Sequence, residues 1–118
     1  MTTLSRYTRL FFHLPVNNEA ERDAAQQVVD ELSRRYRGAT TSLLEAPVFR
    51  GYWESDGQFM EDAVALILVD VQDRAMDSPE LAAELAEMRR FAFRAYEQAG
   101  APQLEIWLVS HPIFRMGD

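Results

Sequence analysis

Residues 56–71 read DGQFMEDAVALILVDV, and this stretch decides the fold that the sequence predicts. Its first two residues, Asp56 and Gly57, form a dipeptide that is typical of a tight hairpin turn. The apolar run AVALILV at 63–69 does not alternate with polar residues, which is typical of a strand covered on both faces. We therefore expect a hairpin whose second strand, residues 61–71, lies in the centre of a sheet.

Segments on both sides of this hairpin are predicted as further strands. Residues 40–53, before the turn, are rich in β-branched and aromatic side chains, and Pro47 indicates an edge strand or a bulge. Residues 6–15 are aromatic-rich and alternate, which indicates a first strand. Residues 103–110 predict a last strand, and we expect Pro112 to stop it.

Two helices are predicted from the residues at their ends. The sequence NEAE at 18–21 places an asparagine cap three residues before a glutamate, as in a capping box, and Gly38 ends the helical pattern that follows. The sequence SPE at 78–80 combines a hydroxyl cap, a proline suited to the first turn and an acid near the positive end of the helix dipole. Gly100 ends this second helix.

The predicted order of elements is β-α-β-β-α-β, which indicates an α+β class and a ferredoxin-like fold, with a single domain over residues 1–118. Right-handed crossovers place the first and third strands side by side, and we expect these two strands to be parallel. The second strand then lies outside the third, and the fourth outside the first. The four strands therefore take the order 4-1-3-2 in a mainly antiparallel, mixed sheet, with both helices on one face.

The sheet face turned away from the helices is predicted to be strongly apolar. Side chains alternate along a strand, and six large apolar residues fall on this face: Phe11, Val64, Leu66, Leu68, Trp107 and Val109. Each gains about 1.5–3 kcal/mol on full burial, and an exposed patch of this breadth is rare on a monomer. We expect a sheet-to-sheet homodimer or higher homo-oligomer to cover it. A small-molecule pocket between the partners is compatible with this arrangement.

The charge of the chain argues against nucleic-acid partners. The net charge is −7, which repels phosphate backbones. Single-stranded RNA stacking on Phe11 and Trp107 would also need aromatic residues on the central strand, which has none. We therefore predict no nucleic-acid partner.

The residue types that are missing exclude several chemistries. The chain has no cysteine and no lysine, so disulfides, thiolate nucleophiles and Schiff bases are excluded. Its longest apolar run is too short to span a bilayer, and no signal peptide is evident. We expect a cytoplasmic protein with no membrane partner.

Five side chains are expected to gather at one end of the sheet and form a ligand site: Tyr7, Arg9, Trp53, Glu61 and His111. In the predicted topology, the end of the second strand, the start of the third and the end of the fourth meet beside the start of the first. A carboxylate, an imidazole, a guanidinium and an indole together can bind and protonate a small acid or phenol. The alternative is structural: Glu61 pairs with an arginine, and Trp53 fills the corner of the hairpin.

The two histidines, His13 and His111, are not predicted to share a metal ion. Both lie near the C-terminal ends of antiparallel strands, so we expect them at opposite ends of the sheet. The zinc-protease and EF-hand motifs are absent as well. We predict no metal and no cofactor.

The spacing of residues from Gly38 onward resembles a bacterial family catalogued as a domain of unknown function. That family shares a layout of G-x-T, G-x-W, a glycine and a glutamate before an aliphatic strand, and the matching residues are Gly38–Thr40, Gly51–Trp53, Gly57 and Glu61. The resemblance implies the ferredoxin-like fold and carries no activity. At the level of fold and open face, the chain is also similar to dimeric α+β-barrel proteins such as small cofactor-free monooxygenases.

Together these features predict a homo-oligomeric, non-catalytic binding or assembly module that uses the apolar sheet face. The alternative is a small cofactor-free enzyme of the dimeric α+β-barrel kind, acting on an apolar acid or phenol near Trp53, Glu61 and His111. A closed, dry space between sheets would favour the module. An open pocket holding His111 or Arg9 would favour the enzyme.

Overall fold

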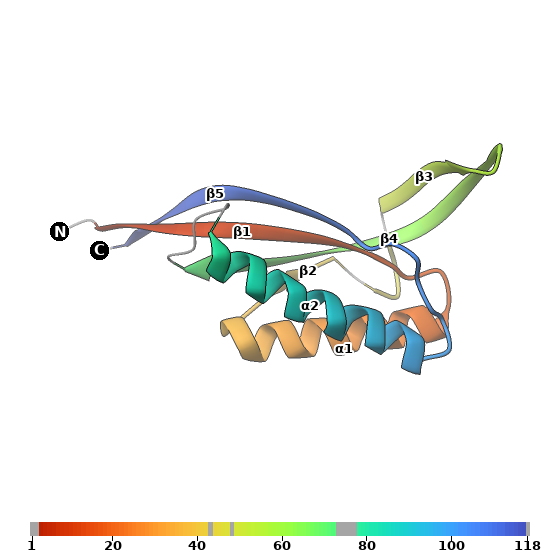
Figure 1. Ribbon diagram of the computed structural model, residues 1–118, viewed down its shortest axis with the longest axis horizontal. Helices are drawn as coiled ribbons and strands as arrows, with labels where there is room; N and C mark the ends of the chain where they lie inside the picture. The colour runs from red at the N-terminus through yellow and green to blue at the C-terminus, as the bar shows by residue number, and fades with distance from the viewer. Residues whose placement is uncertain (1–2, 43, 48, 73–77, 118) are drawn as a thin grey trace.

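The computed structural model describes residues 3–42, 44–47, 49–72 and 78–117, and the side chains of Thr3, Trp53 and Ser55 lie outside this description. In the described residues, five strands form one sheet, and two helices lie against one of its faces (Figure 1). The elements in chain order are β1 (Thr3–Pro15), α1 (Glu19–Tyr36), β2 (Thr40–Thr41), β3 (Phe49–Ser55), β4 (Gln58–Gln72), α2 (Pro79–Gln98) and β5 (Trp107–Gly117). The predicted α+β class, with both helices on one face, is confirmed.

β1 lies between β4 and β5, and its pairing with β4 corrects the predicted strand direction. The sheet order is β2-β4-β1-β5, and β3 also pairs with β4. All of these pairs are antiparallel, with Arg9 opposite both Asp70 of β4 and His111 of β5. The expectation that the first and third strands are parallel is wrong, because the turn between β3 and β4 reverses the chain. The four-strand order 4-1-3-2 is also corrected, since the described sheet has five strands.

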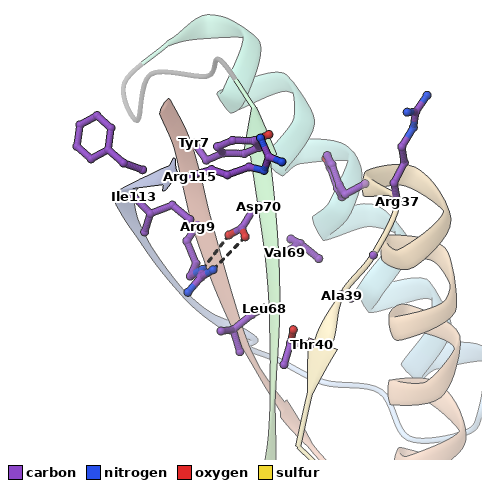
Figure 2. A pocket seen from close by; sticks show the side chains of 13 residues that line it. Tyr7, Arg9, Arg37, Ala39, Thr40, Leu68, Val69, Asp70, Ile113 and Arg115 are labelled. Atoms are coloured by element: carbon purple, nitrogen blue, oxygen red, sulfur yellow. Dashed lines mark hydrogen bonds and ion pairs between the residues drawn. The ribbon is translucent and has the colours of Figure 1, made fainter. Parts of the chain in front are cut away.

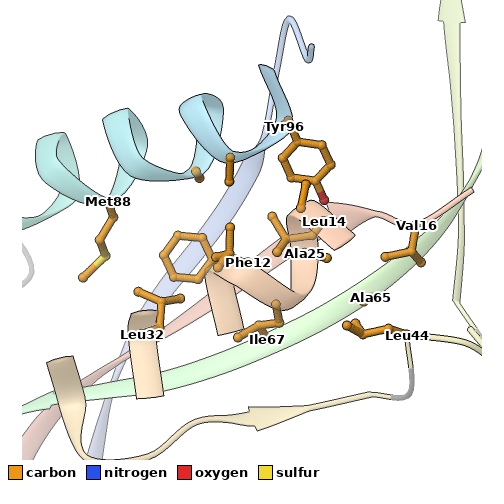
Figure 3. Close-up of a cluster of buried hydrophobic side chains, with 14 of the residues drawn as sticks. Phe12, Leu14, Val16, Ala25, Leu32, Leu44, Ala65, Ile67, Met88 and Tyr96 are labelled. Carbon is orange, nitrogen blue, oxygen red and sulfur yellow. The ribbon is translucent and has the colours of Figure 1, made fainter. Parts of the chain in front are cut away.

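The predicted second strand, residues 40–53, is divided into two strands that pair with different parts of β4. Just after β2, Ser42 still holds the sheet edge: its N–H donates to the Leu66 carbonyl at 3.0 Å, and its Oγ accepts from the Leu66 N–H at 3.0 Å. The chain then leaves the sheet so that Leu44 joins the buried core (Figure 3). Pro47 lies in this break, before the pairing resumes at β3.

The last strand, β5, begins later and extends further than predicted. It covers residues 107–117 instead of 103–110, and it passes through Pro112, which pairs with Thr8 of β1. β5 lies at the edge of the described sheet, and an edge strand accepts a proline whose nitrogen points away from the neighbouring strand. Leu104, which lies within the predicted strand, precedes the observed one and is 99 % exposed.

The core lies between the sheet and the two helices (Figure 3). Alternate side chains of the central strands point into it with the predicted parity: Leu10, Phe12 and Leu14 from β1, and Ala65, Ile67 and Val69 from β4. Tyr96 of α2 is also fully buried in this core, and its hydroxyl donates to the Pro15 carbonyl at 2.8 Å. The remaining side chains of β1 and β4 therefore lie on the opposite face of the sheet.

Both helices begin at their predicted caps. At the start of α1, Asn18 Oδ1 accepts from the Glu21 N–H at 2.9 Å, and Glu21 Oε1 accepts from the Asn17 N–H at 2.8 Å. At the start of α2, Ser78 Oγ accepts from the Leu81 N–H at 3.1 Å. These bonds satisfy donors that the first turn of a helix leaves without a partner. Neither helix of the described chain is long and apolar enough to cross a membrane.

The β3–β4 hairpin rises away from the helices, on the other side of the sheet (Figure 1). Its turn is at the predicted place, with Asp56 at φ 51° and Gly57 at φ 79°, the left-handed conformations that a two-residue turn of this type requires. We call residues 49–62 the hairpin arm. Large apolar side chains on the arm are exposed, among them Tyr52 and Phe59.

Candidate functional site

The face of the sheet away from the helices, which we call the open face, carries all six apolar residues that were predicted there. Phe11, Val64, Leu66 and Leu68 are half-buried by their neighbours on the sheet. Trp107 and Val109, on the edge strand β5, are 68 % and 48 % exposed. The structure thus places these six apolar side chains on one face of β1, β4 and β5, with His13 between Leu66 and Trp107.

A groove of about 570 Å³ lies at one end of this face, where the strands meet the segment that leaves α1 (Figure 2). Its described lining contains three arginines and one acid, namely Arg9, Arg37, Arg115 and Asp70. The arginines come from β1, from the end of α1 and from β5. We call this feature the arginine groove.

Arg9 and Asp70 form a two-pronged ion pair across β1 and β4 (Figure 2). Arg9 Nε donates to Asp70 Oδ1 at 2.8 Å, and Arg9 Nη2 donates to Asp70 Oδ2 at 3.0 Å. These hydrogen bonds raise the pKa of the Arg9 guanidinium, while its partial burial acts in the opposite direction. Both side chains are about one-third exposed, so the pair fixes the orientation of Arg9 more than it stabilises the fold.

The other two arginines of the groove have no ion-pair partner in the part of the chain that the structure describes. Arg115 lies beside Tyr7, close to the Arg9–Asp70 pair (Figure 2). Arg37 follows α1 in a left-handed conformation, with φ at 61°, and its side chain points away from the pair (Figure 2). Arg9 and Arg115 are therefore the two cations that face the groove.

His111 lies next to the groove, on β5 opposite Arg9. Its ring stacks on Phe11, with 5.1 Å between ring centroids and 28° between ring planes. Its Nδ1 is 3.3 Å from the Pro112 carbonyl oxygen, and the role of that nitrogen depends on the tautomer. Tyr7, Arg9 and His111 are thus brought together, as the sequence predicts.

Glu61 and Trp53 are not part of this group. Glu61 pairs with Tyr52 near the turn, nine residues along β4 from Asp70, which is about 30 Å at the rise of an extended strand. The expected gathering of five side chains is therefore wrong, because it assumed that β4 runs parallel to β1. The Glu61 Oε1 atom lies 3.8 Å from Arg50 Nε, as in the structural alternative. The side chain of Trp53 lies outside the described residues.

The two histidines also differ from their predicted placement. His13 pairs with Trp107 and His111 with Arg9, so the histidines are four residue positions apart on one face, about 13 Å, and not at opposite ends. Among the described residues, no group of three or more His, Cys, Asp or Glu side chains could hold a metal ion.

A second polar cluster ties α1 to the sheet. Glu21 accepts hydrogen bonds from the Asn17 side chain at 2.9 Å and from Gln103 at 3.2 Å, and Asp62 accepts from the Asn17 side chain at 2.9 Å. Desolvation raises the pKa of Asp62, against the effect of its hydrogen bond from Asn17. These groups bind one another across the end of the core, so the cluster has a structural role.

Sequence reasoning missed Asp70, Arg37 and Arg115 as groove residues. The alternation of side chains along the strand places Asp70 on the open face, and this could have been read from the sequence. Its pairing with Arg9, however, requires the antiparallel register. Arg115 was missed because the last strand was expected to stop at Pro112.

No protein-family model matches this sequence, and a comparison with curated proteins finds no match. The bacterial family that the spacing from Gly38 onward resembles is therefore not confirmed.

Several solved structures are similar to this chain. CutA1 from Oryza sativa has a TM-score of 0.52 at 13% identity, covering 92% of this chain and 82% of that one. CPII, a nitrogen regulatory PII-like protein from Thiomonas intermedia K12 bound to ADP, AMP and bicarbonate, has a TM-score of 0.46 at 16% identity, covering 96% and 91%. The YXEP protein of Bacillus subtilis, a dinuclear metal binding peptidase of the M20 family, has a TM-score of 0.38 at 15% identity, covering 96% of this chain and 25% of that one. The likeness to CutA1 shows the fold alone: this chain is an α+β protein of ferredoxin-like architecture.

Proposed function

We propose that this protein is a non-catalytic assembly and binding module that packs the open face of its sheet against the same face of a second copy. The observation that carries the proposal is the exposure of Trp107 and Val109 beside four further apolar side chains on that face. An exposed apolar surface of this breadth is rare on a monomer, and two-fold self-association is the commonest way to cover one.

The size of the open face supports a second copy as the partner. β1 is 13 residues long. At about 3.3 Å per residue and about 4.8 Å between neighbouring strands, the three long strands β4, β1 and β5 span roughly 43 by 14 Å, or about 600 Å², and the two-residue strand β2 adds little. A standard protein interface buries about 800 Å² on each partner. The open face therefore supplies most of the area of a standard interface, and the exposed side chains of the hairpin arm can supply the rest.

The hairpin arm supports the same arrangement. It rises on the side of the sheet where the partner would sit (Figure 1). Phe59, at 84 % exposure, and Met60 lie on this arm. A second copy on the open face would remove part of this apolar surface from water as well, which adds to the stability of the dimer.

A charge placed on the open face, at the exposed position of Trp107, tests the proposal. We expect Trp107→Glu to weaken dimerisation by about 100-fold or more, because the dimer would bury the new carboxylate without a partner. Trp107 is exposed in one copy, so the variant should keep its fold, which circular dichroism checks. The mass in solution is measured by sedimentation equilibrium at micromolar concentration.

Leu104→Glu is the matched control, because Leu104 is almost fully exposed and precedes β5. It introduces the same charge and should leave the dimer intact. A monomeric wild-type protein at micromolar concentration would refute the proposal, and so would a Trp107→Glu variant that dimerises as well as Leu104→Glu.

A further inference from the structure

The arginine groove carries positive charge in a chain that is strongly acidic. The chain as a whole has a net charge of −7, whereas the charged side chains that face the groove are two arginines, Arg9 and Arg115, and one aspartate, Asp70. The local excess of cations attracts anions to this end of the sheet against the field of the rest of the molecule.

Arg9 is held in a fixed orientation within the groove. Asp70 accepts hydrogen bonds from Nε and from one hydrogen of Nη2, which leaves Nη1 and the second hydrogen of Nη2 without a described partner. A guanidinium that is already oriented loses little side-chain freedom when it binds a carboxylate or a phosphate. The free edge of Arg9 is therefore a preformed donor pair.

Arg115 supplies a second cation on the same side. In β5 it lies two residues beyond Ile113, which pairs with Tyr7, so Arg115 and Tyr7 are neighbours on the sheet (Figure 2). Arg115 has no ion-pair partner among the described residues. Arg115 lies opposite Ser5 and Arg9 opposite His111, so the two cations lie on either side of Tyr7 along the sheet.

The groove is too large for a bare ion. Its volume of about 570 Å³ lies in the range of about 300–1,000 Å³ that is typical of sites for small organic molecules. Part of its lining is apolar and comes from Tyr7, Leu68 and Ile113. These side chains offer a surface for the hydrocarbon or aromatic part of a ligand.

We propose that the arginine groove binds a small organic anion, with the carboxylate or phosphate group on the free edge of Arg9 and with Arg115 as the second cation that attracts it. The apolar body of the ligand rests against Tyr7, Leu68 and Ile113. Each copy of the chain supplies all of these groove residues, and Leu68 is the one that the groove shares with the six apolar residues of the open face.

Isothermal titration calorimetry on the full chain at low salt tests this site with four probes: benzoate, phenyl phosphate, inorganic phosphate and the uncharged benzyl alcohol. We expect at least one aromatic anion to bind with a dissociation constant below about 1 mM, and inorganic phosphate and benzyl alcohol to bind at least tenfold more weakly. Tighter binding of benzoate assigns the site to carboxylates, and tighter binding of phenyl phosphate assigns it to phosphate esters.

Three variants locate the binding. Arg115→Gln should weaken the aromatic anion at least tenfold, while Arg90→Gln, which removes the same charge from an exposed position on α2, should leave its affinity unchanged. The double variant Arg9→Gln, Asp70→Asn keeps the net charge of the chain and leaves no unpaired carboxylate, and it should abolish binding. Trp107 does not line the groove, so Trp107→Glu should bind the aromatic anion at least as tightly as the wild-type protein, and a failure of self-association would not be mistaken for a failure of this site.

Other outcomes overturn the inference. If neither benzoate nor phenyl phosphate binds, the inference is wrong. It is also wrong if Arg115→Gln and Arg90→Gln lose the same affinity for the aromatic anion, because that would indicate only a general charge effect. Inorganic phosphate binding as tightly as phenyl phosphate would show a site for a bare ion. Benzyl alcohol binding as tightly as benzoate would show an apolar site that does not recognise charge.

Discussion

Tyr96 carries a polar group into the core, at the end of β1. Its side chain is fully buried, and its hydroxyl donates to the carbonyl of Pro15 at the end of β1. Burial raises the pKa of the Tyr96 phenol, and the nearby carboxylates of Glu21 and Asp62 act in the same direction. The neutral phenol therefore holds α2 to the end of the central strand.

Removing this hydroxyl should destabilise the protein measurably. We expect Tyr96→Phe to lower the free energy of unfolding by about 1–3 kcal/mol, because the Pro15 carbonyl would stay buried without its donor. Urea denaturation measures the change. Tyr52→Phe, on the exposed hairpin arm, is the control and should change stability by less than about 0.5 kcal/mol. Equal effects of the two variants would contradict this account.

The same phenol should limit stability at alkaline pH. Its pKa is raised in the folded state above the ordinary value of about 10, so the unfolded chain loses this proton first. The contribution of Tyr96 is therefore fully present below about pH 10 and is lost as the pH rises further. The pKa of Tyr36 is also raised, by burial and by its hydrogen bond to Glu84. Tyr36 therefore also lowers stability at alkaline pH, in the wild-type protein and in Tyr96→Phe alike. The fall in stability above about pH 10 should be smaller in Tyr96→Phe than in the wild-type protein.

At the scale of elements, the start of α1 depends on one side-chain cap. Asn18 accepts from the Glu21 N–H, and Glu21 in turn accepts from the backbone of Asn17. We expect Asn18→Ala to lower the free energy of unfolding by about 0.5–2 kcal/mol, since the Glu21 N–H would lose its acceptor. Asn18→Asp keeps an acceptor and adds a negative charge near the positive helix end, so it should retain full stability. Urea denaturation measures the stability of both variants. Equal losses in Asn18→Ala and Asn18→Asp would contradict the assignment of Asn18 as the cap of α1.

The elements that the sequence predicts well are those set by neighbouring residues. Caps and tight turns involve residues within four positions of one another, so the helix starts and the Asp56–Gly57 turn are placed correctly. The break near Pro47 and the passage of β5 through Pro112 depend instead on distant parts of the chain. Leu44 leaves the sheet edge because the core accepts it, and Pro112 is accepted because β5 lies at an edge.

The candidate site depends on register, which no local signal in the sequence determines. Tyr7, Arg9 and His111 come together because they occupy the same region of β1 and β5, in either direction of β4. Glu61 was expected beside them only because β4 was taken to run with β1. The direction of β4 therefore decides which carboxylate meets Arg9, and the structure selects Asp70.

At the scale of the whole molecule, the protein is elongated. Its extents are 53 × 30 × 27 Å, and its Cα radius of gyration is 15.4 Å. A compact domain of this length has a radius of gyration of about 13.5 Å. The hairpin arm extends past the helices at one end, and the joined ends of β1 and β5 extend past them at the other (Figure 1). These two extensions account for the excess.

Small-angle X-ray scattering of the Trp107→Glu variant, as a monomer, should therefore give a radius of gyration clearly above that of a compact domain. The matched variant adds a shortened arm, in which an Asn-Gly turn replaces residues 52–61 and joins the paired residues Gly51 and Asp62. It should fold, because none of the described side chains that it removes is buried, and its radius of gyration should be smaller. An identical radius for both proteins would mean that the arm lies folded against the sheet in solution.

Because β1 lies between β4 and β5, its second edge stays unpaired during synthesis until β5 has been made. Thr8 pairs with Pro112, so 104 further residues must be added after Thr8 before that contact can form. Ribosomes add about 5–20 residues per second, which makes this delay about 5–20 s. One edge of the aromatic first strand has no partner within the chain during that time. During this delay the unpaired edge of β1 can pair with another chain, and faster translation of the segment between β1 and β5 would shorten the delay.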